Sequence, residues 1–258
     1  MEYSMQQAKL QVIAEDLLTE DQPSALAAYI TQDPQDIRKA LELRYRVFAQ
    51  DMGAQVQGAD AGIDKDRFDD YCMHLVVKDL ASGQIVAYSR ILTNDLAARA
   101  GGFYSATEFD ISQVLKPGFS YMEIGRTCVD QEFRSGSGLG QLWGFIADYM
   151  EREKIDYLMG CCSIPTQDGY IQANASMDFL RDGYMTPENM RVFPEVAVPV
   201  VEIPEERIQP PSLLRAYLRL GVRICGELCL DEAFGVADVM ILLRRQDLNL
   251  RYLKRIMR

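Results

Sequence analysis

One continuous stretch, residues 121–143, constrains the fold of this chain more than any other. It reads YMEIGRTCVDQEFRSGSGLGQLW, and its first part, up to Val129, is apolar enough to predict a buried strand. Closely spaced glycines follow, and the apolar spacing after them predicts a helix over residues 138–154. A strand, a glycine-rich loop and a helix in direct succession indicate an α/β fold.

The rest of the chain alternates helices and strands without an internal repeat or a clear linker. Asp33, Pro34 and Gly53 suit an N-cap, a first helical turn and a helix end, so they predict a helix between them. Residues 74–92 contain two apolar runs around a Ser-Gly turn and predict a β-hairpin. The other predicted elements are a helix over residues 1–20, a loop over 55–70, a short helix from a capping box at Ser105 and Glu108 to about Leu115, strands over 155–164, 192–203 and 239–243, and helices over 174–182, over 211–220 and at the C-terminus.

The glycine-rich loop predicts a binding site for a phosphate group. Main-chain N–H groups at the start of a helix can hold an anion, and Arg134 at the loop entrance adds a charged donor. The loop lacks the Gly-Lys-Ser/Thr ending of a Walker A loop, and its glycines are not spaced as in a dinucleotide-binding turn. The alternative interpretation is a flexible loop without a ligand.

The net charge and its distribution along the chain favour some classes of binding partner and argue against others. The chain has a formal net charge of -11, which argues against nucleic acid, because binding to phosphates needs a basic surface. Residues 244–258, in contrast, contain six lysines and arginines and one acid. This segment predicts a solvated helix end, or a contact with an acidic protein or with the anionic inner face of a membrane.

The sequence has no pattern typical of export or of a metal site. The first ten residues lack the basic-then-apolar order of a signal peptide, and the apolar runs are far shorter than the ~20 residues that span a bilayer. We therefore expect a soluble, cytoplasmic protein. The six cysteines form no Cys-x-x-Cys pair and there is one histidine, so we expect reduced thiols and no metal ion.

The central stretch also resembles a known superfamily. The strand, Val129-x-x-x-x-Arg134, the glycine loop and the helix together resemble the acyl-CoA-binding motif of GNAT-superfamily N-acyltransferases. Glu123-Ile-Gly-Arg126-x-Cys128 is similar to the branch of L-ornithine N-alpha-acyltransferases, N-acyl amino acid synthases and acyl-homoserine-lactone synthases. Further segments resemble that branch between about residues 35 and 245: Leu43 to Phe48, Asp66 to Asp69, Tyr88 to Leu92, Gly102 to Asp110, Trp143, Tyr217 to Gly221, Cys225 to Glu227, and Asp238.

The resemblance implies a GNAT-like α/β (α+β) fold, with a mixed, mainly antiparallel sheet flanked by helices. It places this domain at residues 33–258, after a helical extension at residues 1–32. It implies that a long acyl group, such as a 3-hydroxyacyl group, moves from acyl carrier protein or acyl-CoA to the α-amine of an amino acid. Ornithine is the first candidate, and the product would be a lyso-ornithine lipid. The thioester is a co-substrate, and no bound cofactor is implied.

One departure from the superfamily concerns the acyl donor. The CoA-binding loop places glycines three and five residues after the arginine, whereas Gly138 and Gly140 lie one place later, four and six residues after Arg134. Both CoA and the phosphopantetheine of a carrier protein therefore stay open as donors. The residues expected to contact the donor are Val129, Arg134, Ser135, Gly136, Ser137, Gly138 and Gly140.

Acyl transfer needs an acceptor for the amine proton and groups that hold both substrates. Glu123 is expected to receive that proton or to hold an ammonium group, and the alternative is an ion pair with Arg126 or Arg90. His74 is a second candidate base, because its pKa lies near neutrality, or else it is a hydrogen-bonded structural residue. Arg126 is expected to fix the charges of the catalytic site, since arginine keeps its proton.

The residues expected to bind the amino acid are Arg44, Phe48, Asp66, Asp69 and Arg90. The two arginines, together with Arg126, can bind a carboxylate through paired hydrogen bonds. The two aspartates are expected to meet the second amine of ornithine, and the alternative is that they are solvated loop residues.

Three other functions stay open at this point. A short-chain N-acetyltransferase would use acetyl-CoA, and the glycine-rich loop suits it. An acyl-homoserine-lactone synthase would consume S-adenosylmethionine. A sensor of acyl thioesters or lipids on the same scaffold would bind without turnover.

Overall fold

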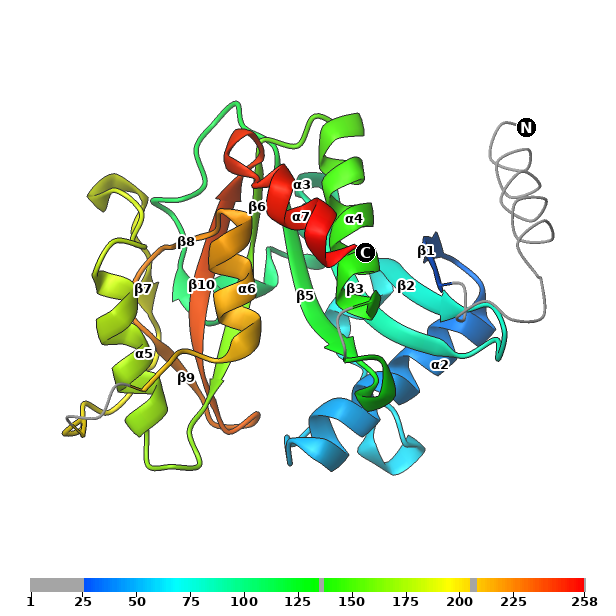
Figure 1. The fold of residues 1–258 in the computed structure, drawn as a ribbon, viewed down its shortest axis with the longest axis horizontal. Helices are drawn as coiled ribbons and strands as arrows, with labels where there is room; N and C mark the ends of the chain where they lie inside the picture. Colours follow the sequence, from blue (N-terminus) through cyan, green and yellow to red (C-terminus); the bar gives the residue numbers. More distant parts are fainter. Residues whose placement is uncertain (1–25, 135–136, 205–207, 258) are drawn as a thin grey trace.

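The computed structural model describes residues 26–134, 137–204 and 208–257, which form, besides a separate two-stranded sheet of β4 and β7, a mixed main sheet with helices on both faces (Figure 1). The strand order is β1-β2-β3-β5-β6-β10-β8, and β9 pairs with β10. Within this sheet the neighbours are antiparallel except β5 and β6, which are parallel. The strands are β1 (Leu26–Thr31), β2 (Met73–Asp79), β3 (Ile85–Thr93), β4 (Phe109–Asp110), β5 (Tyr121–Val129), β6 (Tyr157–Pro165), β7 (Phe193–Pro194), β8 (Arg223–Ile224), β9 (Cys229–Asp231) and β10 (Val236–Arg244).

The first helix after β1 begins as the sequence predicts. The side chain of Asp33 accepts a hydrogen bond from the N–H of Gln35, and Pro34 occupies the first turn. The helix continues as a π-helix over Arg46–Asp51, and Gly53, with a φ of +79°, follows it. The α-helices are α2 (Pro34–Tyr45), α3 (Asn94–Ala100), α4 (Ser137–Arg152), α5 (Ile171–Arg181), α6 (Ser212–Leu220) and α7 (Leu250–Ile256). None of the described helices is long and apolar enough to cross a bilayer.

Alternating side chains along the strands build an apolar core on each face of the sheet. Leu75 and Val77 of β2 belong to the core that α4, α5, α6 and α7 cover. Val76, between them, belongs to the core under α2. Trp143 of α4 is buried in the first core and packs edge-on against Tyr217 of α6, with ring centres 5.2 Å apart. The face under α2 and α3 is the one that carries the charged side chains described below.

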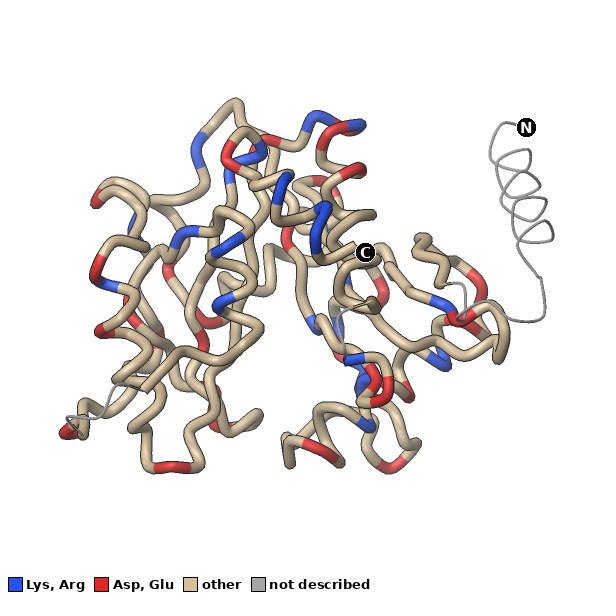
Figure 2. The backbone as a smooth tube through the Cα atoms, viewed as in Figure 1, with Lys and Arg blue, Asp and Glu red and all other residues tan. Residues whose placement is uncertain are grey.

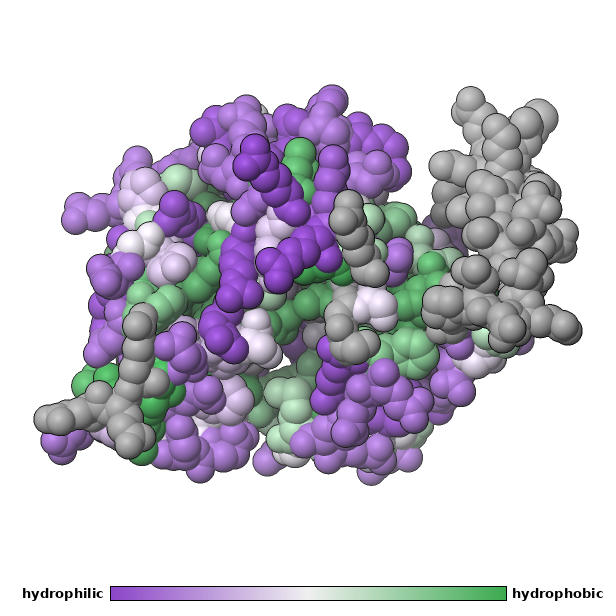
Figure 3. Space-filling view, viewed as in Figure 1, coloured by the Kyte–Doolittle hydropathy of each residue, from purple (hydrophilic) through white to green (hydrophobic). Residues whose placement is uncertain are grey.

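The sheet parts between β5 and β6. Their pairing covers only Tyr121 to Glu123 on β5 and Tyr157 to Met159 on β6, after which β5 pairs with β3 alone and β6 with β10 alone. The two halves diverge toward the lower side of Figure 1, and the surface is hollowed between them (Figure 3). Next to the parting, the register between β3 and β5 shifts in a bulge, and Arg126 adopts a left-handed φ of +52°. Bulge and parting therefore distort the sheet at one place.

Two predicted elements differ from the structure. Residues 26–31, expected in a helical extension, form β1, which pairs with β2 along its whole length. The segment 192–203 contributes only the two-residue strand β7, because Pro194 and Pro199 interrupt it and cannot donate to a ladder. The predicted helix over residues 1–20 lies outside the described residues.

The predicted capping box at Ser105 is also wrong. A single 3₁₀ turn, Tyr104–Thr107, replaces the expected helix, and no side chain caps it. The hydroxyl of Ser105 donates to Glu123 on β5, so a tertiary contact uses the group that a local cap would need. The predicted hairpin at β2 and β3 and the strand–loop–helix at β5 and α4 are confirmed.

Candidate active site

Three arginines and three aspartates form one network on the α2 face of the sheet. Arg44 on α2 donates from Nε to Asp64 Oδ2 over 2.9 Å and from Nη1 to Asp69 Oδ1 over 2.6 Å. Arg90 on β3 donates to Asp66 Oδ1 over 2.6 Å. Burial alone would raise the pKa of Asp69, but the guanidinium groups of Arg44 and Arg90 outweigh burial and hold that pKa below its usual range. Asp69 is therefore an ionised partner of these arginines.

Asp66 and Asp69 also organise the loop before β2. The side chain of Asp66 accepts from the N–H of Phe68, and the side chain of Asp69 accepts from the N–H of Asp66. This reciprocal pair closes the 3₁₀ turn Arg67–Asp70. The structure thus places both aspartates against arginines and main-chain donors rather than as free acceptors for an amine.

Arg126 is the arginine of this network that faces open space. Its side chain is 12% exposed, and Nη2 lies 3.2 Å from Asp66 Oδ2. The guanidinium carbon lies 4.5 Å from the ring centre of Phe234 and 5.1 Å from that of Tyr104, so the charge is held between two aromatic faces. These four residues line a pocket of about 300 Å³. Phe48 supports the pocket from outside, with its ring edge-on to Phe234 at 5.9 Å.

Glu123 lies beneath the pocket and is 2% exposed. Its carboxylate accepts from the N–H groups of Tyr104 and Ser105, at 2.6 and 2.7 Å, and from the Ser105 hydroxyl. Burial raises the pKa of Glu123, and these donors offset part of that rise. Among the described residues Glu123 makes no ion pair with Arg126 or Arg90, whose partners are the aspartates. Glu123 therefore ties β5 to the turn that carries Tyr104 into the pocket.

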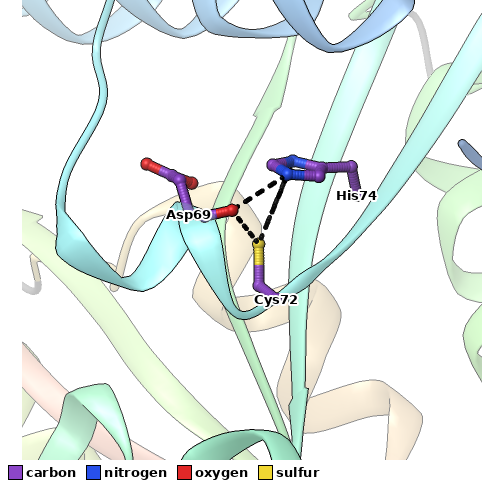
Figure 4. Close-up of side chains that lie close together, drawn as sticks. All are labelled: Asp69, Cys72 and His74. Atoms are coloured by element: carbon purple, nitrogen blue, oxygen red, sulfur yellow. Dashed lines mark hydrogen bonds between the residues drawn. The ribbon is translucent and has the colours of Figure 1, made fainter. Parts of the chain in front are cut away.

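His74 lies in a buried network behind the arginines (Figure 4). Its Nδ1 is 2.9 Å from the hydroxyl of Tyr88, and its Nε2 is 3.2 Å from the main-chain oxygen of Asp69. Burial lowers the pKa of His74, so its imidazole is neutral at pH 7. The two ring nitrogens are thus engaged with β3 and with the loop before β2.

Asp69, Cys72 and His74 offer ligand atoms within 4.8 Å of one another. Figure 4 shows that the carboxylate of Asp69 points away from the other two side chains, which contact its main-chain oxygen instead. That carboxylate is already paired with Arg44, and burial raises the pKa of the Cys72 thiol to about 12. A neighbouring guanidinium and a protonated thiol do not favour a metal ion here.

The expected acyl-donor residues gather where β5 meets α4. Val129 ends β5, and Gly138 packs directly on it, because a Cβ at Gly138 would lie 3.0 Å from Val129 Cγ1. Arg134 folds back over the strand end: its Nε donates to the main-chain oxygen of Val129 and its Nη2 to Asp51, both over 3.1 Å. Ser137 opens α4. Residues 135 and 136, also expected at the donor site, lie outside the described residues.

Gly140 has a packing role that the sequence did not indicate. A Cβ at this position would lie 2.1 Å from the main-chain oxygen of Ile256, at the end of α7. The absence of a side chain at Gly140 therefore lets the two helices touch.

Three acids that the sequence did not indicate as site residues lie close together beside a second pocket, which Glu108 and Asp231 line. Glu108 follows the 3₁₀ turn, Asp231 ends β9 and Asp238 lies on β10, and their carboxylate oxygens lie within 4.8 Å of one another. A signal existed for Asp238, which is an isolated charge in the apolar strand VADVMILL. No local pattern marked Asp231 or Phe234, because only the tertiary fold brings the β9–β10 hairpin to the site.

Known proteins resemble this chain over most of its length. The acetyltransferase (GNAT) domain description matches residues 43–144. An L-ornithine N(alpha)-acyltransferase of Brucella abortus is 35% identical over 84% of this chain and 83% of its own length. A protein of the same name from Rhodobacter capsulatus is 30% identical over 88% of this chain and 93% of its own length. The chain belongs to the L-ornithine N(alpha)-acyltransferase family.

Solved structures similar to this family member identify its fold. A CoA-dependent acyl-homoserine lactone synthase superposes with a TM-score of 0.55 at 13% identity, over 91% of this chain and 90% of the other. An N-acyl amino acid synthase from uncultured soil microbes superposes with a TM-score of 0.51 at 12% identity, over 88% and 97%. The expected GNAT fold, with its mixed and mainly antiparallel sheet, is confirmed.

This L-ornithine N(alpha)-acyltransferase family member is an acyltransferase with its expected site residues in three places. Asp66 and Arg126 line the pocket, and Phe48 packs behind its wall. Arg44, Asp69, Arg90, His74 and Glu123 are buried around it. Val129, Arg134, Ser137 and Gly138 lie at the exit of β5.

Proposed function

We propose that this protein transfers a long acyl group, such as a 3-hydroxyacyl group, from a thioester to the α-amine of ornithine and forms a lyso-ornithine lipid. The observation that carries the proposal is the 30–35% identity to L-ornithine N(alpha)-acyltransferases over most of the chain. The pocket fits it physically, because Arg126 offers a positive charge for a carboxylate beside a group of acids that suits ammonium.

The proposed chemistry is direct transfer. The neutral α-amine attacks the thioester carbon, the new N–C bond forms, the C–S bond breaks, and the thiol leaves with a proton. Glu123 is the proposed base: through the Ser105 hydroxyl that donates to it, it accepts the amine proton and then returns that proton to the departing thiolate. The β5 bulge takes Arg126 and its neighbours out of the regular ladder, which suits main-chain donors that hold the thioester oxygen. We expect Glu123→Gln to lower kcat by about 10²–10⁴-fold, as measured by product formation.

A carrier protein is the proposed acyl donor. Carrier proteins are acidic, and Lys and Arg positions gather along α6 and α7 (Figure 2). Four of these residues are exposed: Arg219, Arg251, Lys254 and Arg255. The end of α7 contacts Gly140 in the first turns of α4, next to the loop proposed to hold the phosphopantetheine phosphate. A docked carrier protein would thus present its thioester beside β5.

The experiment is a mass-spectrometric transfer assay on the purified protein. Ornithine is offered with 3-hydroxyacyl carrier protein, long-chain acyl-CoA or acetyl-CoA in separate reactions. A lyso-ornithine lipid from the carrier-protein reaction supports the proposal and its donor together. Product from acetyl-CoA alone would select a short-chain acetyltransferase, and no product with ornithine from any donor would overturn the choice of amine.

A further inference from the structure

Glu108, Asp231 and Asp238 form an acidic group, and two of its three carboxylates are buried. Glu108 and Asp238 are 8% and 4% exposed. No donor in the described part of the chain meets either carboxylate oxygen of Glu108 with good hydrogen-bond geometry, although the Tyr104 hydroxyl and the Cys161 thiol lie near enough to oppose the rise of its pKa on burial. Asp238 accepts one hydrogen bond, from the hydroxyl of Ser163 across the β6–β10 pair, at 2.7 Å. Buried polar groups are normally paired, so an unpaired carboxylate beside two others indicates a missing cationic partner.

A pocket of about 410 Å³ opens onto this group. Glu108 and Asp231 line it, together with Tyr104 and Cys229. The pocket shares Tyr104 and Asp231 with the one that contains Arg126, so the two form adjoining spaces. The pocket at Arg126 therefore contains the guanidinium groups of Arg126 and Arg67 beside aspartates, two of which pair with Arg126, whereas the charged side chains that line the other pocket are all acids.

This distribution of charge matches an amino acid with a second amine. Its α-carboxylate would pair with Arg126, and a side-chain ammonium would reach the carboxylates beyond Tyr104. Asp66 and Asp69, the acids that the sequence suggested for this purpose, are occupied by arginines. Burial raises the pKa of Glu108 and of Asp238, so an arriving ammonium would stabilise charges that the empty site disfavours.

We infer that Glu108, supported by Asp231 and Asp238, binds the side-chain ammonium of the amino-acid substrate and thereby selects a diamino acid over its monoamino analogue. The inference rests on the proposed function for its substrate. It assigns the choice of amine to Glu108, after the turn Tyr104–Thr107, together with the β9–β10 hairpin, while the chemistry takes place at β5.

The test compares ornithine with 2-aminopentanoate, which has the same carbon chain and no second amine. In Glu108→Gln we expect KM for ornithine to rise at least about tenfold and kcat to change little, because a charge-assisted contact is lost. KM for 2-aminopentanoate should stay within about twofold. Glu232→Gln, an equal loss of charge at the exposed rim of the pocket, is the matched control. An unchanged KM for ornithine in Glu108→Gln would overturn the inference.

Two further measurements keep the inference separate from the proposed function. If wild-type protein acylates no ornithine, calorimetric binding of ornithine and of 2-aminopentanoate still tests the group, and equal affinity for both would overturn it. If Glu108→Gln does not fold, Asp238→Asn replaces it in both assays. Titration with Ca²⁺ and Mg²⁺ tests the rival cation: a metal affinity that Glu108→Gln abolishes, with no effect on ornithine, also overturns the inference.

Discussion

At the scale of single residues, the arginines of the site differ most from their expected role. All three pair with aspartates, but Arg44 and Arg90 are buried, whereas Arg126 alone of the three borders a pocket. A buried ion pair adds little to stability over an apolar pair, but removal of one partner leaves an uncompensated charge. Arg44 and Arg90 therefore hold the site in shape, and Arg126 is the one placed to meet substrate.

Replacement of Arg44 tests this difference. Arg44→Met keeps most of the side-chain volume but removes the nearest guanidinium of Asp64 and of Asp69, whose remaining arginine partners lie 3.3 and 3.5 Å away. We expect the free energy of unfolding to fall by about 3–5 kcal/mol, measured by urea denaturation. Arg38→Ala, which removes an exposed pair with Glu42, should change it by at most about 0.5 kcal/mol. A loss below about 1 kcal/mol in Arg44→Met would contradict the role of the network.

In the absence of substrate, the ionised carboxylate of Glu108 should lower the stability of the folded protein. Its pKa is higher in the folded protein than in the unfolded chain, so folded stability falls as pH rises between those two values. Glu108→Gln does not titrate, so we expect a higher melting temperature than wild type at pH 7–8. The difference should vanish below the ordinary pKa of glutamate, about 4.3, where both chains carry a neutral side chain. Asp231, Asp238 and Arg126 surround the Glu108 side chain and are the same in both proteins. Thermal melts at several pH values measure the difference in melting temperature between wild type and Glu108→Gln. A lower melting temperature at pH 8 would show that the charge is compensated.

Individual residues were predictable where local chemistry marked them. Asp33 and Pro34 predicted the start of α2, and the charged side chains in the apolar strand at 121–129 indicated where the candidate site lies. The partners of Arg44 were not predictable, because Asp64 and Asp69 lie in a loop and nothing local fixes which side chain they meet. Pairings of this kind arise only when the fold is complete.

At the scale of elements, the contact of α4 with α7 is the feature that could not be predicted from the sequence. Gly138 and Gly140 both lie in the stretch expected to hold phosphate, yet Gly138 packs on Val129 and Gly140 packs on Ile256. A glycine row between a strand and a helix thus serves close packing on two sides of α4.

A pair of alanine substitutions separates packing from helix propensity. In Gly140→Ala the new Cβ meets main-chain atoms of α7, and we expect a loss of about 1–3 kcal/mol in the free energy of unfolding. In Gly144→Ala it meets only the flexible end of Met257, so the gain in helix propensity, up to about 1 kcal/mol, should survive. Chemical denaturation measures both. Equal effects at the two positions would argue against close contact of α7 with α4.

Elements with a strong local pattern were predicted well, and those that depend on neighbours were not. The hairpin of β2 and β3, and α6 after its proline, follow from turn and cap chemistry. The strands β1 and β9, which were not predicted, exist because a neighbouring strand satisfies their main-chain groups, whereas the predicted strand over 239–243 is confirmed as part of β10. The segment 192–203 has the apolar residues of a strand, but its prolines interrupt it, and only Phe193 and Pro194 form one.

At the scale of the whole molecule, charge is unevenly placed on an acidic protein. The net charge is -11, yet α6 and α7 present exposed basic side chains together (Figure 2). Complementary charges accelerate association and are screened by salt over about 10 Å at 0.1 M. An acidic carrier protein would gain from this surface.

Salt and charge reversal therefore test the proposed donor. With carrier-protein donor, we expect kcat/KM to fall steeply, about tenfold, between low and physiological ionic strength. The double variant Lys254→Glu with Arg255→Glu should remove most of that dependence at low salt. Lys116→Glu, an exposed charge reversal outside α6 and α7, should keep it. Identical salt profiles for the wild type and the double variant would exclude α7 as the docking surface.

The parting of the sheet between β5 and β6 has an evolutionary consequence. Asp231 and Asp238 belong to the half after the parting, while the arginine network and the strand end at Val129 belong to the half before it. Few strand contacts join the halves, so mutations that change one are weakly coupled to the other. A lineage can thus replace the acceptor it recognises by altering one half of the sheet and inherit its thioester chemistry intact from the other.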